Sequence, residues 1–333
     1  MTATMEESPQ PEAAQPKQLG PQKSPPTTIS LGSCIGGVPI KLHLSFFLLL
    51  LIEFISSIRL AGEFPLYMLF VVVLYGPVLL LTVLVHEFGH VFATKRLGGE
   101  VGGIVLWPLG GFAICGPTGS LSGELKVALA GPLTHIPQML FWWMIYLLVK
   151  YEFDMTGQET GLWPSFSIFL KTMSTGPAGF FQVLAGEAVW LNIILFCFNL
   201  LIPAYPLDGG RVYAAGLILK FGVEPMKAAF VTAMTAMTIS LAMVSYSIVA
   251  LFTGGAGFSL YFGLVGLYVF SESFELYKAV KKNDLKNHPI FGGECYQSGG
   301  GAAASSTEGD GDLTMAEVPL PPANIPAEEG VMA

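Results

Sequence analysis

Residues 79–96 read LLLTVLVHEFGHVFATKR, and this stretch decides both the fold and the chemistry. An apolar run leads into HEFGH at 86–90, which fits the pattern H-E-x-x-H. On a helix, residues four apart lie on the same face. Two imidazoles at that spacing can bind one zinc ion, and the Glu beside the first can act as a general base. We predict His86 and His90 as metal ligands and Glu87 as the catalytic base, rather than a chance match.

The composition places this helix in a membrane. Hydrophobic residues make up 52% of the 333 and charged residues 12%, whereas a soluble domain carries about 25% charged residues. A helix that crosses the bilayer core needs about 20 apolar residues. We predict an all-α polytopic membrane protein with about six transmembrane helices, near 42–60, 65–97, 124–150, 183–206, 228–252 and 257–280.

The basic residues orient these predicted spans. With six spans, both chain ends lie on one side, and that side holds most of the 16 Lys and Arg residues. The other side holds only Arg59, Lys150 and Lys171. Since cytoplasmic loops carry the excess of Lys and Arg, we predict that both termini are cytosolic.

The two ends of the chain differ from the middle. Residues 1–30 are rich in Pro, Gln and Glu, and residues 283–333 are rich in Gly, Ala, Ser and acids. Such segments bury too little apolar surface to offset their ordering entropy. We predict disordered tails around a membrane domain at 39–282, with a catalytic core at about 65–225. Nucleic acid is excluded as a partner, because nothing is basic enough to track phosphates.

A third metal ligand is expected from a separate segment, since a catalytic zinc usually takes three protein ligands and a water. Residues 199–211 read NLLIPAYPLDGGR and contain Asp208 on the same predicted side of the membrane as His90. Asp208 is therefore a candidate ligand. It could instead cap a helix that starts at Gly209. The four cysteines show no CxxC spacing, which argues against a Cys-ligated zinc.

The two motifs together resemble the site-2 protease family of intramembrane zinc metalloproteases. The residues that carry the likeness lie within roughly 40–225 and are HEFGH, the downstream N…PxxPLDGG, Pro108-Leu109-Gly110-Gly111 and Ala130-Gly131-Pro132. The resemblance implies one zinc ion per chain, held by His86, His90 and Asp208, with Glu87 as the base. It also implies that the substrates are transmembrane segments of other proteins.

Two further polar residues are candidates for contacts with the substrate carbonyl or oxyanion. The resemblance assigns this role to Asn199, and an interhelical hydrogen bond is the alternative. His135 stands close to a position where the family favours Asn. It could contact substrate, support a ligand from behind, or simply bond between helices. Glu53 and Glu187 could line a water-filled path, or lie near the membrane interface.

The glycine-rich stretch at 98–119 predicts short strands and turns. Hydrolysis needs an extended peptide, because a helix uses its carbonyls in internal hydrogen bonds. An edge strand near the zinc could capture substrate by strand addition. A plain hairpin is the alternative.

Two other functions remain open at this point. One is an inactive relative that binds membrane proteins without cutting them, which the intact Glu87 argues against. The other is a zinc transporter, which needs polar residues along a path through most spans. The absence of charge between Lys227 and Glu272 disfavours a transporter.

Overall fold

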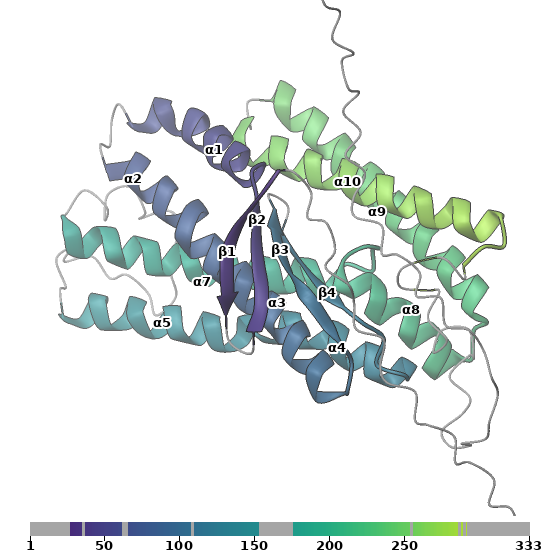
Figure 1. Ribbon diagram of the computed structural model, residues 1–333. Helices are drawn as coiled ribbons and strands as arrows, with labels where there is room; N and C mark the ends of the chain where they lie inside the picture. The colour runs from purple at the N-terminus through teal and green to yellow at the C-terminus, as the bar shows by residue number, and fades with distance from the viewer. Residues whose placement is uncertain are drawn as a thin grey trace, which may run out of the picture.

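The computed structural model describes residues 27–34, 37–61, 66–107, 110–152, 176–253, 256–285, 288 and 291. It is mostly helical, with one small sheet near the centre (Figure 1). The strands are β1 Thr28–Cys34, β2 Val38–His43, β3 Val101–Trp107 and β4 Gly110–Cys115. The helices are α1 Phe46–Ala61, α2 Leu66–Val73, α3 Leu79–Arg96, α4 Leu121–Leu133, α5 His135–Glu152, α7 Pro177–Leu201, α8 Asp208–Phe221, α9 Pro225–Phe252 and α10 Ala256–Lys281.

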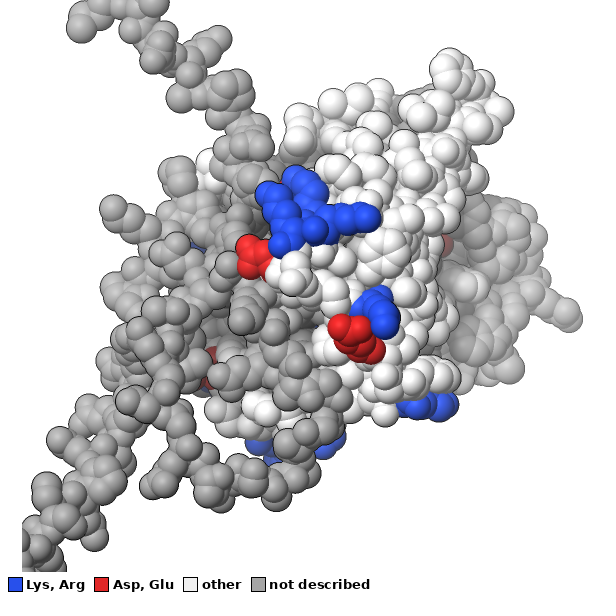
Figure 2. All heavy atoms as spheres, turned by 90° about the vertical axis from the view of Figure 1, so that its right-hand side faces the viewer, with Lys and Arg blue, Asp and Glu red and all other residues white. Residues whose placement is uncertain are grey.

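Three helical stretches in the described part of the chain are long and apolar enough to cross a membrane. They are Leu66–Arg96, Pro177–Leu201 and Pro225–Phe252, and a shorter apolar helix covers Phe46–Ile55. Many exposed side chains along α9 are large and apolar, up to Phe252 at 87% exposure. Figure 2 shows one face on which a few small groups of charged side chains stand among uncharged surface. These features support a membrane protein, but within the residues that the structure describes only three of the six predicted spans meet the length and composition of a crossing.

The first crossing stretch is one continuous helix built from α2, a π-helical segment at Leu74–Val78, and α3. Pro77 lies inside the π-helical segment. Proline has no N–H for the helical ladder, so the backbone widens there instead of stopping. The irregular segment precedes the HEFGH turns, which are therefore regular α-helix.

The span predicted at 124–150 is wrong as a single helix, because α4 ends at Leu133 and α5 begins at His135. The physical reason lies at Pro137. This residue lacks the N–H that would bond to the Leu133 carbonyl, and its ring clashes with that carbonyl in a continuous helix. The break at Thr134 places His135 at the start of a new helix.

The four strands form one sheet in the order β1-β2-β3-β4. Strands β3 and β4 lie within the glycine-rich stretch that was expected to contain short strands, whereas β1 and β2 were not predicted. The β2–β3 pair is parallel and the other two pairs are antiparallel. Val38, Ile40 and Leu42 of β2 are buried in the same apolar cluster as Val91 of α3. The sheet therefore packs on the helix that carries HEFGH, and β4 is left as an edge strand.

Both disordered tails were predicted to be too long, because ordered residues extend into each of them. Residues 28–34 form β1, although the disordered N-terminal tail was predicted to extend to residue 38. At the other end, Leu285 and Phe291 are buried in an apolar cluster with Ile218 of α8. Both corrections come from tertiary pairing, which the local composition does not report. Residues 1–26 and 292–333 lie outside the described part of the chain.

Candidate active site

Three predicted ligands from two distant segments come together in the interior. The Nε2 atoms of His86 and His90 lie 3.1 Å apart. The Oδ2 atom of Asp208 lies 3.1 Å from the first and 3.2 Å from the second. All three side chains are buried, with exposures of 8% or less. The convergence predicted from sequence is therefore present in the structure.

The spacing of these three atoms fits a zinc ion. Ligand atoms about 2.0–2.1 Å from a tetrahedral zinc lie roughly 3.3 Å from one another. The observed separations of 3.1–3.2 Å come within a few tenths of an ångström of that edge. Two imidazole nitrogens and one carboxylate oxygen leave a fourth position open, as in catalytic sites. Among the described residues this is the one group of His, Cys, Asp and Glu that could hold a metal.

Helix α4 packs directly behind the two histidines because glycine lets it approach. A Cβ atom built on Gly131 would collide with the His90 ring and lie 2.8 Å from Nε2 of His86. On α3, a Cβ on Gly89 would lie 2.5 Å from the backbone oxygen of Ala130. The close approach also brings the carbonyl of Val127 to 2.7 Å from Nδ1 of His90. That ring nitrogen donates to the carbonyl, so Nε2 has its lone pair free for a metal.

Asp208 is the first residue of α8 and does not cap it. The N-cap position belongs to Leu207, and no side-chain capping bond is formed. One oxygen of Asp208 faces the histidines, and the other lies 3.7 Å from Nη1 of Arg211. Burial opposes the charge on this carboxyl, but the neighbouring His90 and His86 hold its pKa below the usual range. The ligand interpretation of Asp208 is therefore favoured over the cap.

Glu87 faces the edge strand β4. The backbone amide of Ala113 hydrogen bonds to its carboxylate. A Cβ atom on Gly111 would lie 2.7 Å from the carboxyl carbon of Glu87, so only glycine leaves room for this side chain. Glu87 is 4% exposed. The candidate base thus lies between the histidine helix and the edge of the sheet.

The two predicted substrate-contact residues, His135 and Asn199, have different surroundings in the structure. His135 is 2% exposed, and its Nε2 lies 3.0 Å from Nδ1 of His86. Its Nδ1 lies 3.0 Å from Oδ1 of Asn192 on α7. Asn199 is half-buried near the end of α7, and in the described part of the chain it makes no hydrogen bond to the candidate ligands. Sequence reasoning missed Asn192, although an Asn in the middle of an apolar helix was a visible signal.

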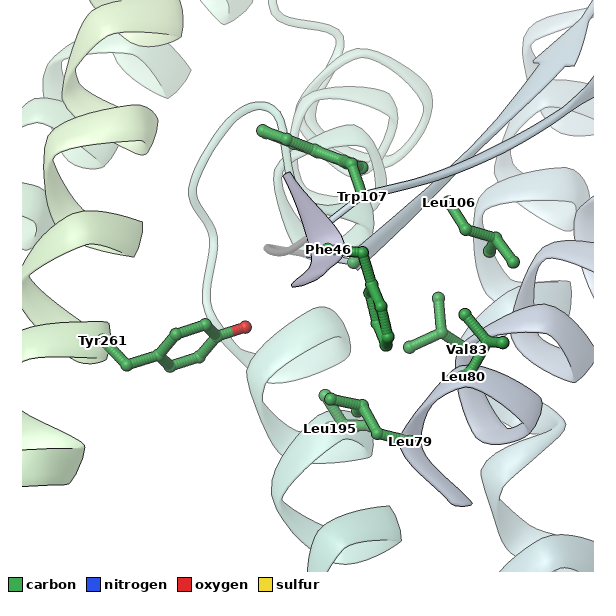
Figure 3. Close-up of a pocket in the computed structure, with 9 residues that line it drawn as sticks. Phe46, Leu79, Leu80, Val83, Leu106, Trp107, Leu195 and Tyr261 are labelled. Carbon is green, nitrogen blue, oxygen red and sulfur yellow. The ribbon is translucent and has the colours of Figure 1, made fainter. Parts of the chain in front are cut away.

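A small apolar recess lies beside the candidate base. Its cavity volume is about 30 Å³, and its lining comes from five elements around α3. Leu80 and Val83 of α3 lie about two turns and one turn before Glu87, respectively. Gly110 precedes the glycine that contacts Glu87. In Figure 3 the rings of Phe46 and Trp107 stand over the recess, and the hydroxyl of Tyr261 points toward it. The recess suits a small apolar side chain.

Other predicted features take no part in this cluster. Glu53 and Glu187 are half-buried on α1 and α7. Cys115 and Cys197 are free thiols outside the metal group. Pro108, Leu109 and Cys295 lie outside the described residues.

The fold and the site define a class: helical membrane proteins with a two-histidine, one-carboxylate metal centre on an HExxH helix. The family model of Peptidase family M50 matches residues 76–245, which is half of the chain. The chain therefore belongs to Peptidase family M50, the site-2 protease family. The membrane-length helices and the family together identify an integral membrane protein.

Three known proteins are similar to this chain. One is "Zinc metalloprotease MJ0392" of Methanocaldococcus jannaschii, 26% identical over 267 residues, 77% of this chain and 66% of the relative. Another is "Putative zinc metalloprotease Rip3" of Mycobacterium tuberculosis, 26% identical over 219 residues, 64% of this chain and 49% of the relative. The chain thus spans between half and two thirds of these relatives. The solved structure "Site-2 Protease from Methanocaldococcus jannaschii" has a TM-score of 0.46 at 25% identity, covering 75% of this chain and 95% of that one.

Proposed function

We propose that this chain is an intramembrane zinc metalloprotease, which hydrolyses peptide bonds in or near transmembrane segments of other membrane proteins. The observation that carries the proposal is the convergence of His86, His90 and Asp208 beside a buried Glu87. The names of the curated relatives point to the same activity. One zinc ion per chain follows from the single group of candidate ligands among the described residues.

The chemistry divides between the metal and Glu87. Zinc held by the three ligands would supply a Lewis acid that polarises the peptide carbonyl and makes water acidic near neutral pH. Glu87 accepts a proton from the attacking water while the oxygen of that water bonds to the carbonyl carbon of the substrate. The C–N bond then breaks, and Glu87 returns that proton to the leaving amine. The contact with Gly111 and the amide of Ala113 hold the carboxylate in place for both transfers.

The edge strand β4 is the proposed docking site for the substrate backbone. It is the last strand in the sheet order, and it touches Glu87 through Gly111 and Ala113. A transmembrane segment of a substrate that unwinds can pair with such an edge strand. The pairing places the substrate's backbone carbonyls near Glu87. The recess beside Val83 would then accept a small apolar side chain, which membrane segments supply in abundance.

The membrane arrangement is part of the same proposal. Six spans with both termini in the cytosol would open the metal site toward the cytosolic side, where Lys95 and Arg96 end the HEFGH helix. Water would reach the zinc from that side. Substrates are proposed to be single-span proteins, an assignment that rests on the family.

The two competing functions make different demands. A zinc transporter has no use for a base, and it needs polar groups along a path across the membrane. A non-cutting relative would bind the same substrates with or without Glu87. The carboxylate of Glu87 beside the candidate ligands is the feature that favours proteolysis over both.

The proposal is tested by co-expressing the chain with a panel of single-span membrane proteins. We expect Glu87→Gln to lower cleavage by about 10²- to 10⁴-fold, the usual contribution of a general base. The zinc content of the purified protein should not change, because Glu87 is not a ligand. Glu100→Gln is the matched control, since Glu100 is exposed beyond the same helix. Normal cleavage by Glu87→Gln would rule out the mechanism.

A further inference from the structure

A chain of hydrogen bonds runs from helix α7 to the first histidine ligand. It begins at Asn192, which is fully buried and donates from Nδ2 to the Ala188 carbonyl at 2.8 Å. This bond fixes the orientation of the amide group, because a carbonyl can only accept. The Oδ1 atom of Asn192 is thereby turned to His135, 3.0 Å from its Nδ1. Since an amide oxygen also only accepts, Nδ1 of His135 must carry a proton.

The position of this proton determines what the other side of the His135 ring can do. A neutral imidazole with its proton on Nδ1 has a lone pair on Nε2. That Nε2 lies 3.0 Å from Nδ1 of His86. His86 must therefore donate from Nδ1, which leaves the lone pair on its own Nε2. This is the atom that lies 3.1 Å from Asp208 and 3.1 Å from His90.

We propose that His135 and Asn192 form a positioning relay, which holds His86 in the tautomer that presents Nε2 to the metal. The inference rests on the zinc site of the proposed function. His90 reaches the same tautomer more simply, by donating from Nδ1 to the Val127 carbonyl. The two ligands are thus oriented from behind by different means, one by backbone and one by a pair of side chains.

The helix break at Thr134 makes this relay possible. His135 begins α5, and its ring lies between α3 and α7 with a centroid separation of 5.1 Å from His86. Groups that bond to a ligating histidine from behind set its tautomer and ring orientation, and their loss typically costs 10- to 100-fold in metal affinity. His135 is therefore a positioning residue rather than a group that touches substrate.

The test compares two replacements of His135 in the full chain, purified in detergent. Zinc affinity is measured by competition with a chelator, independently of any cleavage. His135→Leu removes the acceptor, and we expect about 10- to 100-fold weaker zinc binding. His135→Gln can place its amide oxygen near the position of Nε2, and we expect affinity within a few fold of wild type. An equal loss in both variants, or no loss in His135→Leu, would overturn the relay.

A second measurement needs no substitution at all. The chain has 5 histidines, so ¹⁵N-histidine labelling gives few enough ring signals to resolve. In the zinc-loaded protein we expect the proton on Nδ1 in His86, His90 and His135, seen in two-bond ¹H–¹⁵N correlations. A proton on Nε2 of His135 would refute the relay even if every variant failed to fold. A wild type that binds zinc with this tautomer pattern but cuts nothing would refute the proposed protease and leave the relay standing.

Discussion

The two segments that bring the candidate ligands together are built in opposite ways. In α3, two ligands stand four residues apart on a regular helix, so their spacing is a property of the local sequence. Asp208 instead follows a turn that ends α7 and begins α8. Its position depends on contacts with several distant elements. The comparison teaches that helical geometry sets the spacing of two of the three candidate ligands, whereas tertiary structure places the third.

The contacts that hold the Asp208 segment can be named. Arg211 lies between Asp208 and Glu124 of α4, with Nη2 at 3.4 Å from the Glu124 carboxylate. Glu124 in turn accepts hydrogen bonds from the backbone and hydroxyl of Thr118. From the other side, the hydroxyl of Ser273 on α10 donates to the Tyr205 carbonyl at 2.7 Å.

The C-terminal residues add to this support. The ring of Tyr205 lies 5.3 Å from that of His288 and 6.1 Å from that of Phe291, which is buried. The segment before Asp208 therefore packs against residues that were predicted to be a disordered tail. The four-residue spacing of the two histidines on α3, by contrast, follows from helical geometry.

We expect the largest loss of zinc affinity when Asp208, the ligand placed by tertiary structure, is removed. Asp208→Ala removes the only carboxylate from the cluster, and we expect zinc affinity to fall by more than the 10- to 100-fold typical of groups behind a ligand. Zinc content after dialysis measures it. Asp284→Ala removes the same charge at an exposed position after α10 and should keep its zinc. Equal zinc in both variants would place the metal elsewhere.

We expect a smaller loss of zinc affinity when the backbone next to Asp208 is displaced by a substitution at Gly209. A Cβ atom on Gly209 would lie 2.9 Å from the Leu200 carbonyl oxygen and would also meet that of Ile202. The Gly209→Ala backbone must shift, and Asp208 with it, so we expect zinc affinity to fall by about 10- to 100-fold. Gly216→Ala on the same helix meets nothing within 4 Å and should bind zinc normally. A matching loss in both would point to helix stability instead of ligand placement.

The smallest of the three effects is expected at Arg211. Replacing it with Gln removes the cation between Asp208 and Glu124 but leaves the ligand itself, so we expect about a 10-fold loss, the lower end for such partners. Chelator competition measures this loss. Lys220→Gln removes an equal charge at the far, exposed end of α8. If Arg211→Gln bound zinc as tightly as Lys220→Gln, the ion pair would have no part in holding Asp208.

The sequence predicted the parts of the molecule that depend on local spacing. The HEFGH helix and the strands within 98–119 are each visible in a few neighbouring residues. The break at Thr134 was also visible through Pro137, but the apolar run around it outweighed that signal. Asp208 was identified as a ligand because the motif around it resembles that of a family. Its spacing alone could not distinguish a ligand from a helix cap.

The remaining features depend on partners that are distant in sequence. Strand β1 exposes both Ile29 and Leu31, so no pattern of burial announces it, and it exists through pairing with β2. Phe291 is buried only because α8 and Tyr205 lie beneath it. His135 and Asn192 are 57 residues apart, and their contact requires α5 and α7 to pack together.

The central claim is that one zinc ion joins the two histidines of α3 to the carboxylate that begins α8. X-ray absorption at the zinc edge of the purified full chain tests this claim most directly. We expect one zinc per chain with only nitrogen and oxygen neighbours at about 2.0–2.2 Å and two imidazoles among them. A sulfur neighbour at about 2.3 Å, or a spectrum unchanged in Asp208→Ala, would contradict it.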